Sequence, residues 1–147
     1  MSTVRALLDA KGHEVLQVTP DTTVERVAHR MREARVGAFV VSRDGRRLDG
    51  LITERDVVLG IARHGGEVVH LRASDLMQHS VITCAPGDSI RSAMTAMTRA
   101  RVRHLPVVDA GGLCGIVSIG DVIKSFVDDA DLEARVLREA YLARSSG

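Results

Sequence analysis

The sequence is poor in aromatic residues: its 147 residues include no Trp, one Tyr and two Phe. Proteins that bind single-stranded nucleic acid stack the bases on aromatic side chains, so this scarcity argues against such a function. Charge of neither sign is in excess, because 20 basic residues face 19 acidic ones and the net charge is +1. A polyanionic partner, nucleic acid above all, is therefore not expected.

Long hydrophobic runs are also missing. No apolar stretch approaches the roughly 18 residues of a membrane span, and the start of the chain, MSTVRALLDAKG, lacks the apolar segment of a signal peptide. The two cysteines, Cys84 and Cys114, have a spacing that fits neither a zinc site nor a redox pair. Free thiols are typical of a reducing compartment. We therefore expect a cytoplasmic protein that does not enter a membrane.

Side chains that could support catalysis or bind metal are sparse as well. Five of the histidines, His13, His29, His64, His70 and His79, have no spacing typical of metal ligands. No nucleophile stands beside a base in the sequence. The sequence thus predicts that the protein is not an enzyme, binds no metal and requires no cofactor. Its apolar content of 45% is nevertheless enough to bury a core.

The chain contains an internal repeat. Residues 15–57 and 81–122 align at an offset of 66 positions, which falls to 65 after one residue is lost in a loop beyond Gly45. Twelve aligned pairs are identical: Val15/Val81, Pro20/Pro86, Met31/Met97, Ala34/Ala100, Arg35/Arg101, Val36/Val102, Val41/Val107, Gly45/Gly111, Leu48/Leu113, Gly50/Gly115, Asp56/Asp121 and Val57/Val122. Two such copies predict like units packed about a pseudo-twofold axis, with two related sites in the cleft between them.

Each copy has the pattern of a β-α-β-β-α unit. In the first copy, Thr22 and Glu25 have the spacing of a capping box that opens a helix, and the run at 36–42 is apolar on both faces, as in a central strand. The strands are expected at 15–18, 36–42 and 48–52, then 81–84, 102–108 and 113–117, and the helices at 22–34 and 53–63, then 88–101 and 118–127. A hairpin turn is expected at 43–46 and another at 109–112.

The repeat divides the chain into three segments. We expect a first unit at 1–66 that begins with a short turn, a second at 67–127 that also begins with a turn, and a C-terminal amphipathic helix and tail at 128–147. The apolar residues assigned to one stripe of that helix are Leu132, Val136, Leu137, Ala140 and Tyr141. Such a stripe needs a partner surface, either on its own domain or on a second subunit.

The junction between the last strand and last helix of each copy carries a shared motif: Gly, two apolar residues, Ser or Thr, two residues, Asp. It begins at Gly50 in one copy and at Gly115 in the other. Ser/Thr-x-x-Asp is a helix capping box that needs no ligand. The same geometry also suits a nucleotide, because a helix N-terminus attracts phosphate and a carboxylate one turn later can accept hydrogen bonds from a ribose diol. Both interpretations stay open at this point.

The repeats, the segment at 103–109 and the two junctions together resemble a tandem pair of CBS domains, the modules named after cystathionine β-synthase. The resemblance covers about residues 3–127. It implies an α/β (α+β) fold in which two pseudo-twofold-related repeats pack through their sheets. It also implies a regulatory, energy-sensing function in which AMP, ADP or ATP binds between the repeats as a regulatory ligand.

The resemblance further implies which residues contact the nucleotide. Asp56 and Asp121 match the aspartates that hold ribose hydroxyls, and Thr53 and Ser118 match hydroxyl residues near the phosphate. The first site would comprise Leu51, Thr53, Asp56, Val81, Ile82, Val102, Arg103 and His104. The second site would comprise Val15, Leu16, Val36, Gly37, Ile116, Ser118 and Asp121.

The two sites are expected to differ in charge. Arg103 and His104 stand where family members place side chains that contact phosphate, whereas the aligned residues of the first copy, Gly37 and Ala38, carry no charge. The first site is therefore expected to fill first. Arg55, inside its junction motif, is better explained as a solvated charge on the helix.

The competing interpretation is a ligand-free module for protein interaction. Its junctions would be caps only, and its helices would form a homodimer. The apolar residues suited to that interface are Val57, Val58, Ile61, Val122, Ile123 and Phe126. In either case the protein would act on a protein target that the sequence does not identify.

Overall fold

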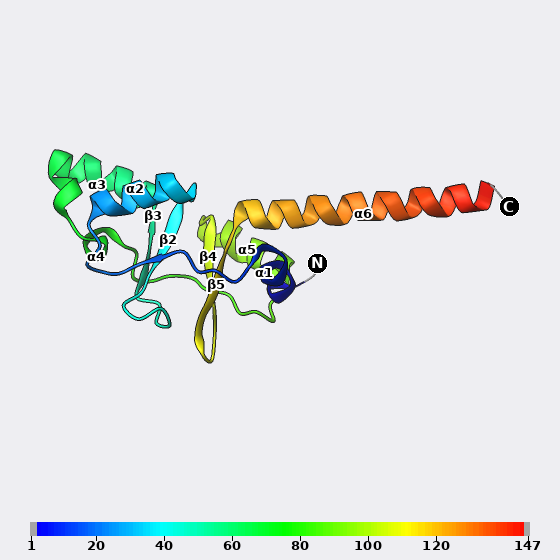
Figure 1. Cartoon of the computed structure of the whole chain (residues 1–147), viewed down its shortest axis with the longest axis horizontal. Coiled ribbons are helices and arrows are strands. Elements are labelled where there is room, and N and C mark those ends of the chain that lie inside the picture. Colours follow the sequence, from blue (N-terminus) through cyan, green and yellow to red (C-terminus); the bar gives the residue numbers. More distant parts are fainter. Residues whose placement is uncertain (1–2, 146–147) are drawn as a thin grey trace.

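The two copies of the repeat form two small α/β units that lie side by side, and one helix projects far beyond them (Figure 1). The structure is a computed structural model that describes residues 3–145. The outermost residues of the expected first and last segments, 1–2 and 146–147, lie outside the described residues.

The first unit contains a three-stranded sheet of order β1-β2-β3. Its elements are β1 (Gln17–Val18), α2 (Val24–Ala34), β2 (Ala38–Val41), β3 (Gly50–Thr53), α3 (Glu54–His64) and the 3₁₀ helix η1 (Gly65–His70). Strand β2 pairs parallel to β1 and antiparallel to β3. All four residues of β2 are buried, which confirms the central position predicted from its apolar run.

The second unit repeats this order with a smaller sheet. It consists of α5 (Ile90–Ala100), β4 (His104–Asp109), β5 (Gly112–Ser118) and the first part of α6 (Ile119–Ser145). Strands β4 and β5 form an antiparallel pair. The strand expected at 81–84 is reduced to one parallel bridge between Cys84 and Val107. The mixed α+β architecture of two like units matches the prediction.

Helix α2 starts differently from the prediction. Its N-cap is Thr23, whose Oγ1 accepts the N–H of Arg26 at 3.3 Å. Thr22 instead accepts the N–H of Thr19 at 3.1 Å, so the capping box predicted for Thr22 and Glu25 is wrong. Two adjacent threonines before an apolar helix face satisfy the sequence pattern equally well, and only the backbone conformation separates them. The apolar residues at helical spacing between 24 and 34 predict one buried face for this helix. Val24, Val27 and Met31 are buried as that spacing predicts, whereas Ala28 and Ala34 are exposed.

The two short helices are exchanged between the units. Helix α1 (Val4–Lys11) precedes the first repeat but packs on the second, where the N–H of Val4 donates to Asp88 O at 2.9 Å. Helix α4 (Ala73–Leu76) precedes the second repeat but packs on the first, where the N–H of Ala73 donates to Thr22 O at 2.7 Å. Each unit is therefore completed by a segment of chain from outside its own repeat, which ties the two units together.

The repeated glycines Gly50 and Gly115 accommodate these exchanged segments. A Cβ at Gly115 would lie 2.8 Å from a methyl carbon of Leu8 in α1. A Cβ at Gly50 would lie 2.7 Å from both the carbonyl oxygen of Gln78 and the sulfur of Met77. Both distances are shorter than real Cβ contacts, so close packing against the exchanged segments accounts for the glycine in each junction motif without a ligand.

The two sheets pack against each other through an apolar cluster, as the predicted fold requires. Ala38, Val40 and Leu51 of the first unit meet Ile116 of the second. The partly buried residues around them are Val15, Leu48, Val81 and Leu113. Burial of this shared surface favours association of the units by roughly 25 cal/mol for each Å² of apolar area.

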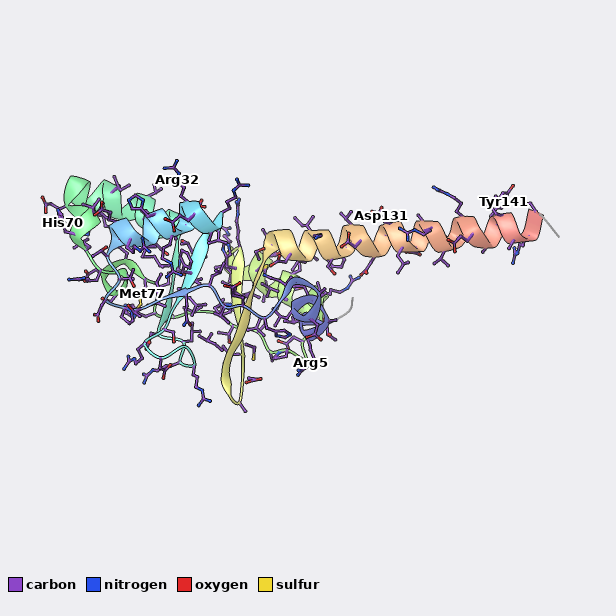
Figure 2. All side chains as sticks on the ribbon, viewed as in Figure 1. Arg5, Arg32, His70, Met77, Asp131 and Tyr141 are labelled. Carbon is purple, nitrogen blue, oxygen red and sulfur yellow. The ribbon has the colours of Figure 1, made fainter. Side chains whose placement is uncertain are left out.

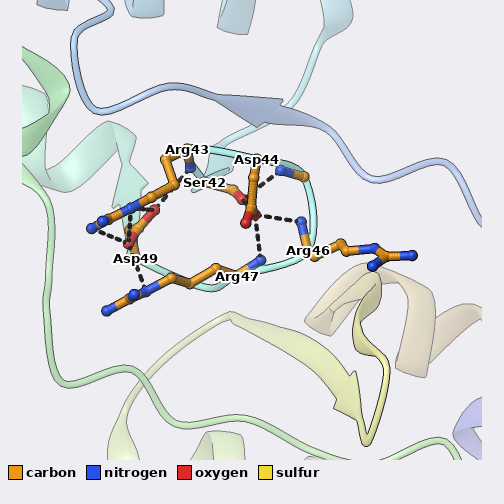
Figure 3. A network of polar contacts seen from close by, with 7 residues as sticks. Ser42, Arg43, Asp44, Arg46, Arg47 and Asp49 are labelled. Carbon is orange, nitrogen blue, oxygen red and sulfur yellow. Dashed lines mark hydrogen bonds and ion pairs between the residues drawn. The ribbon is translucent and has the colours of Figure 1, made fainter.

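The loop between β2 and β3 is held by its own polar side chains (Figure 3). Asp44 Oδ1 accepts the N–H groups of Arg46 and Arg47 at 2.9 and 2.8 Å, and these bonds hold the pKa of Asp44 below its ordinary value. Asp49 accepts the N–H of Arg43 at 2.8 Å and also pairs with its guanidinium. The ordered loop presents Arg46 O to the N–H of Leu113 at 2.9 Å, which adds a backbone link between the units.

Helix α6 is longer than predicted. The helix expected to end near residue 127 and the separate helix expected from residue 128 are one continuous helix of 27 residues. Residues 121–145 contain neither glycine nor proline, so nothing in that sequence breaks the helix. Among the helices formed by residues 3–145, none is long and apolar enough to span a membrane.

Candidate functional site

A cavity of about 570 Å³, the first cleft, opens between the two units. The first unit contributes the N-terminus of α3, and the second contributes the start of β4 together with the N-terminus of α6. The lining residues are Gly37, Leu51, Thr53, Glu54, Arg55, Gln78, Arg101, Val102, Arg103, His104, Ser118, Ile119 and Gly120.

A smaller cavity of about 300 Å³, the second cleft, is its pseudo-twofold counterpart. Here the first unit contributes the residues that precede and begin β2, and the second contributes β5 and the N-terminus of α6. The lining residues are Lys11, Leu16, Arg35, Val36, Gly37, Ala38, His104, Ile116, Ser118 and Asp121.

The structure brings most of the predicted site residues to these clefts. Leu51, Thr53, Val102, Arg103 and His104 line the first cleft, and Leu16, Val36, Gly37, Ile116, Ser118 and Asp121 line the second.

Four predicted residues lie elsewhere. Val15 and Val81 pack in the cluster between the sheets. Ile82 is 44% exposed and lines an open groove along α5. Asp56 lies behind Thr53, one helical turn into α3. An offset between repeats predicts which residues are equivalent, but it does not predict which side of a strand or helix turn faces the cavity.

Asp56 forms a complete capping box. Its Oδ2 accepts the N–H and the hydroxyl of Thr53 at 2.8 and 2.9 Å, and Thr53 Oγ1 accepts the N–H of Asp56 at 3.3 Å. The Gln78 amide also donates to Asp56 Oδ2 at 3.1 Å. The first junction motif therefore has the hydrogen bonds of the capping box that its sequence predicted. A ribose diol at this carboxylate would have to compete with Gln78 and the Thr53 hydroxyl.

Asp121 has the same capping contact but a different second partner. Its Oδ2 accepts the N–H of Ser118 at 2.9 Å and pairs with Lys11 Nζ at 2.7 Å. Lys11 Nζ also donates to Ile116 O at 2.9 Å. Burial raises the pKa of Asp121, but the hydrogen bonds from Lys11 and Ser118 and the charge of Lys11 outweigh it and hold the pKa below the ordinary value.

His104 lies between the two clefts and lines both. Burial lowers the pKa of His104, and the charges of Glu54 and Asp121 only partly oppose this. Its close neighbour is Gly37, where a Cβ would lie 3.1 Å from Glu54 Oε1 and 3.6 Å from His104 Cε1. The glycine thus leaves room for an imidazole and a carboxylate at the junction of the clefts.

Three cleft cations were missed in the sequence, and Arg55, which was assigned to a solvated helix surface, also lines the first cleft. Arg35 and Arg101 occupy identical repeat positions, adopt left-handed conformations with φ of 55° and 56°, and end α2 and α5. Each then lines one cleft. Both arginines are identical across the repeats and stand just before the central strands, and this pattern could have predicted their place at the clefts. No sequence pattern predicts the place of Lys11, because it reaches Asp121 only through the exchange of α1.

The electrostatics of the first cleft favour an anion. The N-termini of α3 and α6 both border it, and Arg101 and Arg103 line it. His104 also lines it and can donate a ring N–H to an anion, but its lowered pKa disfavours a positive charge there. Some of the free N–H groups at these helix N-termini already have partners within the protein. The N–H of Glu54 donates to Gly37 O at 3.0 Å, and the N–H of Ile119 donates to Arg103 O at 2.9 Å. Those bonds position each helix start beside the facing strand.

Metal binding and thiol chemistry have little support in the described part of the chain. Within residues 3–145, no group of three or more His, Cys, Asp or Glu side chains converges on a possible metal position. Cys84 and Cys114 are free thiols. Burial raises the pKa of Cys84 to about 12, so the nucleophilic thiolate is not populated at neutral pH.

Comparison with known proteins identifies the repeat. A family model described as CBS domain matches residues 9–63 and again residues 73–128. The chain is 35% identical over 149 residues to the CBS domain-containing protein CBSX3, mitochondrial, of Arabidopsis thaliana, a match that covers 96% of this chain and 72% of that protein.

Two solved structures extend the comparison to the fold. The crystal structure of the CBS-domain containing protein ATU1752 from Agrobacterium tumefaciens matches with a TM-score of 0.80 and 36% identity, over 84% of this chain and 92% of that one. The CBS domain protein PAE2072 from Pyrobaculum aerophilum, complexed with AMP, matches with a TM-score of 0.71 and 26% identity, over 81% of this chain and 88% of that one.

Proposed function

Because this chain belongs to the CBS-domain family, as a tandem pair of these regulatory modules, we propose that it binds an adenine nucleotide in the first cleft. The observation that carries the proposal is the meeting of two helix N-termini with Arg101, Arg103 and His104 in one cavity. A volume of about 570 Å³ is within the usual size of small-molecule sites, roughly 300–1,000 Å³. The AMP complex of the Pyrobaculum aerophilum relative supports the choice of ligand.

Each part of a nucleotide has a suitable partner in the cleft. The phosphate suits the arginines and the helix N-termini. The ribose suits the Thr53 cap with Asp56 behind it, and the base suits the apolar wall of Leu51 and Val102. Glu54 also lines the cleft and repels phosphate, so we expect the phosphate to lie nearer Arg101 and Arg103.

The proposed action is ligand-dependent packing. The first cleft is lined by both units, so a bound nucleotide favours whichever arrangement of the units closes on it. Because α6 begins at this cleft and continues beyond the body, a shift of the second unit would move the whole helix. A homodimer, a protein target and a cytoplasmic location remain part of this proposal.

The alternative is an interaction module without a ligand. It is favoured by the complete capping box at Asp56 and by the exposed apolar side chains Val58, Ile61, Ile123 and Phe126. Val122, which was also expected at the interface, is fully buried in the core of the second unit. The two functions differ in one respect that can be measured, the binding of nucleotide.

The first test concerns the cleft cations. We expect calorimetry with AMP, ADP and ATP to give micromolar to submillimolar affinity for at least one of them. The substitution Arg103→Ala should then weaken binding about tenfold or more, because a charge-assisted contact to phosphate is lost. Arg99→Ala, on α5 outside the first cleft, is the matched control and should bind like the original protein.

The second test separates ligand binding from capping. Asp56→Ala should reduce nucleotide affinity roughly 10- to 150-fold, the equivalent of about 1.5–3 kcal/mol. Asp75 accepts the N–H of Arg72 at 2.8 Å in the same capping geometry at α4, so Asp75→Ala should lower stability without affecting binding. If both variants are less stable and neither binds nucleotide differently, the junctions are caps only and the interaction module is the better description.

A further inference from the structure

The distal part of α6 lies outside both units. The helix spans Ile119–Ser145, about 40 Å at 1.5 Å per residue, and its buried residues, Val122 and Ser125, lie in its first turns. Residues 130–145 are exposed throughout, and Figures 1 and 2 show them as a single rod that projects away from both units. Most of the stability of a helix in a protein comes from packing of its apolar face rather than from intrinsic helix propensity, so an apolar face on this rod is expected to have a partner surface.

The apolar residues of this rod do not follow the stripe expected from the sequence. Leu132 and Tyr141 are nine positions apart, which at about 100° per residue places them on opposite sides of the helix. The expected stripe that contains both is therefore wrong.

A different set of residues forms one continuous face. It is defined here as the α6 seam and comprises Ile123, Val127, Ala130, Ala134, Leu137 and Tyr141. The members alternate at intervals of four and three residues, the spacing of the a and d positions of a coiled coil. Ile123 and Val127 are 55% and 52% exposed, and Leu137 and Tyr141 are 64% and 72% exposed. An apolar seam this exposed is suited to burial against another helix.

We propose that the α6 helices of two copies of this chain form a parallel, two-stranded coiled coil through the α6 seam. The charges that flank the seam favour a second copy of this chain as the partner, and they favour a parallel orientation of the two helices. Glu133 and Arg138 fall on opposite flanks, at positions g and e. In a parallel pair, position g of one helix faces the following e position of the other. Glu133 of each copy then lies beside Arg138 of the other copy, which gives two attractive pairs.

The antiparallel arrangement brings like charges together. When the seams overlap fully in opposite directions, e positions face e positions and g positions face g positions. Asp131 then faces Asp131 of the second copy, Glu133 faces Glu133, and Lys124 faces Arg138. Each juxtaposition is repulsive, so charge disfavours this arrangement.

The seam also has a shape that suits two copies. Ala130 and Ala134 at its middle allow the helices to approach closely, and the larger Val127 and Leu137 fill the space on either side. The seam begins only five residues after Ser118, which caps α6 at the clefts. The coiled coil goes beyond nucleotide binding, since it gives the protein a defined partner, a second copy, whether or not a ligand is bound.

The first experiment compares two leucines on opposite sides of α6. Leu137→Glu puts a charge in the seam, while Leu132→Glu puts the same charge on the far face at similar exposure, 64% and 56% respectively. Sedimentation equilibrium of the full chain should show a dimer whose Kd rises at least about tenfold for Leu137→Glu and less than about threefold for Leu132→Glu. A monomeric original protein, or equal effects of the two variants, would overturn the proposal.

The second experiment tests orientation. In a parallel pair, residue 141 lies beside residue 141 of the other copy, so Tyr141→Cys in a Cys114→Ser background should form an interchain disulfide under mild oxidation. Absence of that disulfide in a dimeric protein would overturn the proposal. Glu133→Arg and Arg138→Glu should each weaken the dimer, and together they should restore it. A stronger dimer for Arg138→Glu alone would indicate the antiparallel arrangement instead.

Discussion

Lys11 Nζ lies 2.7 Å from Asp121 Oδ2, across 110 positions of the sequence. The equivalent carboxylate of the first repeat, Asp56, is met by the neutral amide of Gln78. Lys11 belongs to the exchanged helix α1, and Gln78 follows the exchanged helix α4. The two clefts therefore share a backbone arrangement but differ in charge, because the second contains the Lys11 ammonium.

This ion pair leads to a prediction about pH. The pKa of Asp121 is lowered from 3.8 in the folded protein, so its contribution to stability is fully present above 3.8 and is lost as pH falls through the folded value. Lys11→Met should lower the free energy of unfolding by about 0.5–1 kcal/mol at pH 7, since the pair is partly exposed. Urea titrations from pH 7 to pH 3 should show the difference shrink below about pH 4. A difference that persists unchanged at pH 3 would contradict the assignment.

His104 should give stability a second pH dependence. Burial lowers its pKa from 6.5, so the unfolded chain binds more protons than the folded one below 6.5. Stability therefore decreases as pH falls from about 6.5 towards the folded value. His104→Gln should flatten the pH dependence of the unfolding free energy between pH 5 and pH 7, with His29→Gln, at an exposed position of α2, as the control. Bound phosphate would favour protonated His104, so nucleotide affinity should be higher at pH 6 than at pH 7.5.

Packing of the exchanged helix should depend on a glycine. In Gly115→Ala the new Cβ would lie 2.8 Å from Leu8 Cδ2, and we expect a loss of about 1–3 kcal/mol of stability from overpacking. Gly87→Ala places its Cβ where no atom lies within 4 Å, so it should be nearly neutral. Chemical denaturation measures both. Equal stability of the two variants would show that α1 does not pack on β5 as described.

Arg101 should lower the stability of the fold through its backbone conformation while strengthening nucleotide binding through its side chain. Its φ of 56° lies in the left-handed region, where glycine is the preferred residue at a helix C-terminus. Arg101→Gly should raise stability by about 0.5–1 kcal/mol while weakening nucleotide binding in the first cleft. Arg35→Gly, at the second cleft, should give the same stabilisation with little effect on the first site. Paired calorimetry and thermal unfolding test this, and unchanged nucleotide affinity in Arg101→Gly would remove Arg101 from the site.

Ser125 offers a stabilising substitution. Its hydroxyl is buried and has no hydrogen-bond partner among residues 3–145. Ser125→Ala should raise stability by about 1 kcal/mol, because it removes an unsatisfied polar group and favours the helix. Ser89 gives the opposite comparison, since its Oγ accepts the N–H of Ser92 at 2.9 Å as the N-cap of α5. Ser89→Ala should cost about 1 kcal/mol, and thermal unfolding should place the two variants on opposite sides of the original protein.

Much of this molecule was determined by local sequence. The order of elements, the buried position of 38–41 and the capping boxes at Thr53 and Ser118 follow from apolar periodicity and from side chains that bond backbone three residues away. The repeat itself indicated two like units. Interactions this short in range depend on neighbouring residues, so one sequence is enough to predict them.

Tertiary structure decided the rest. The exchange of α1 and α4 brings Lys11 to Asp121 and Gln78 to Asp56, and no local pattern marks those pairs. Whether Val81 and Ile82 face the cleft, the sheet core or the surface depends on strand orientation, which the repeat offset does not specify. The helix end expected near residue 127 is absent, and α6 continues to Ser145. A helix ends where a residue such as glycine or a packing contact stops it, and α6 has neither near residue 127.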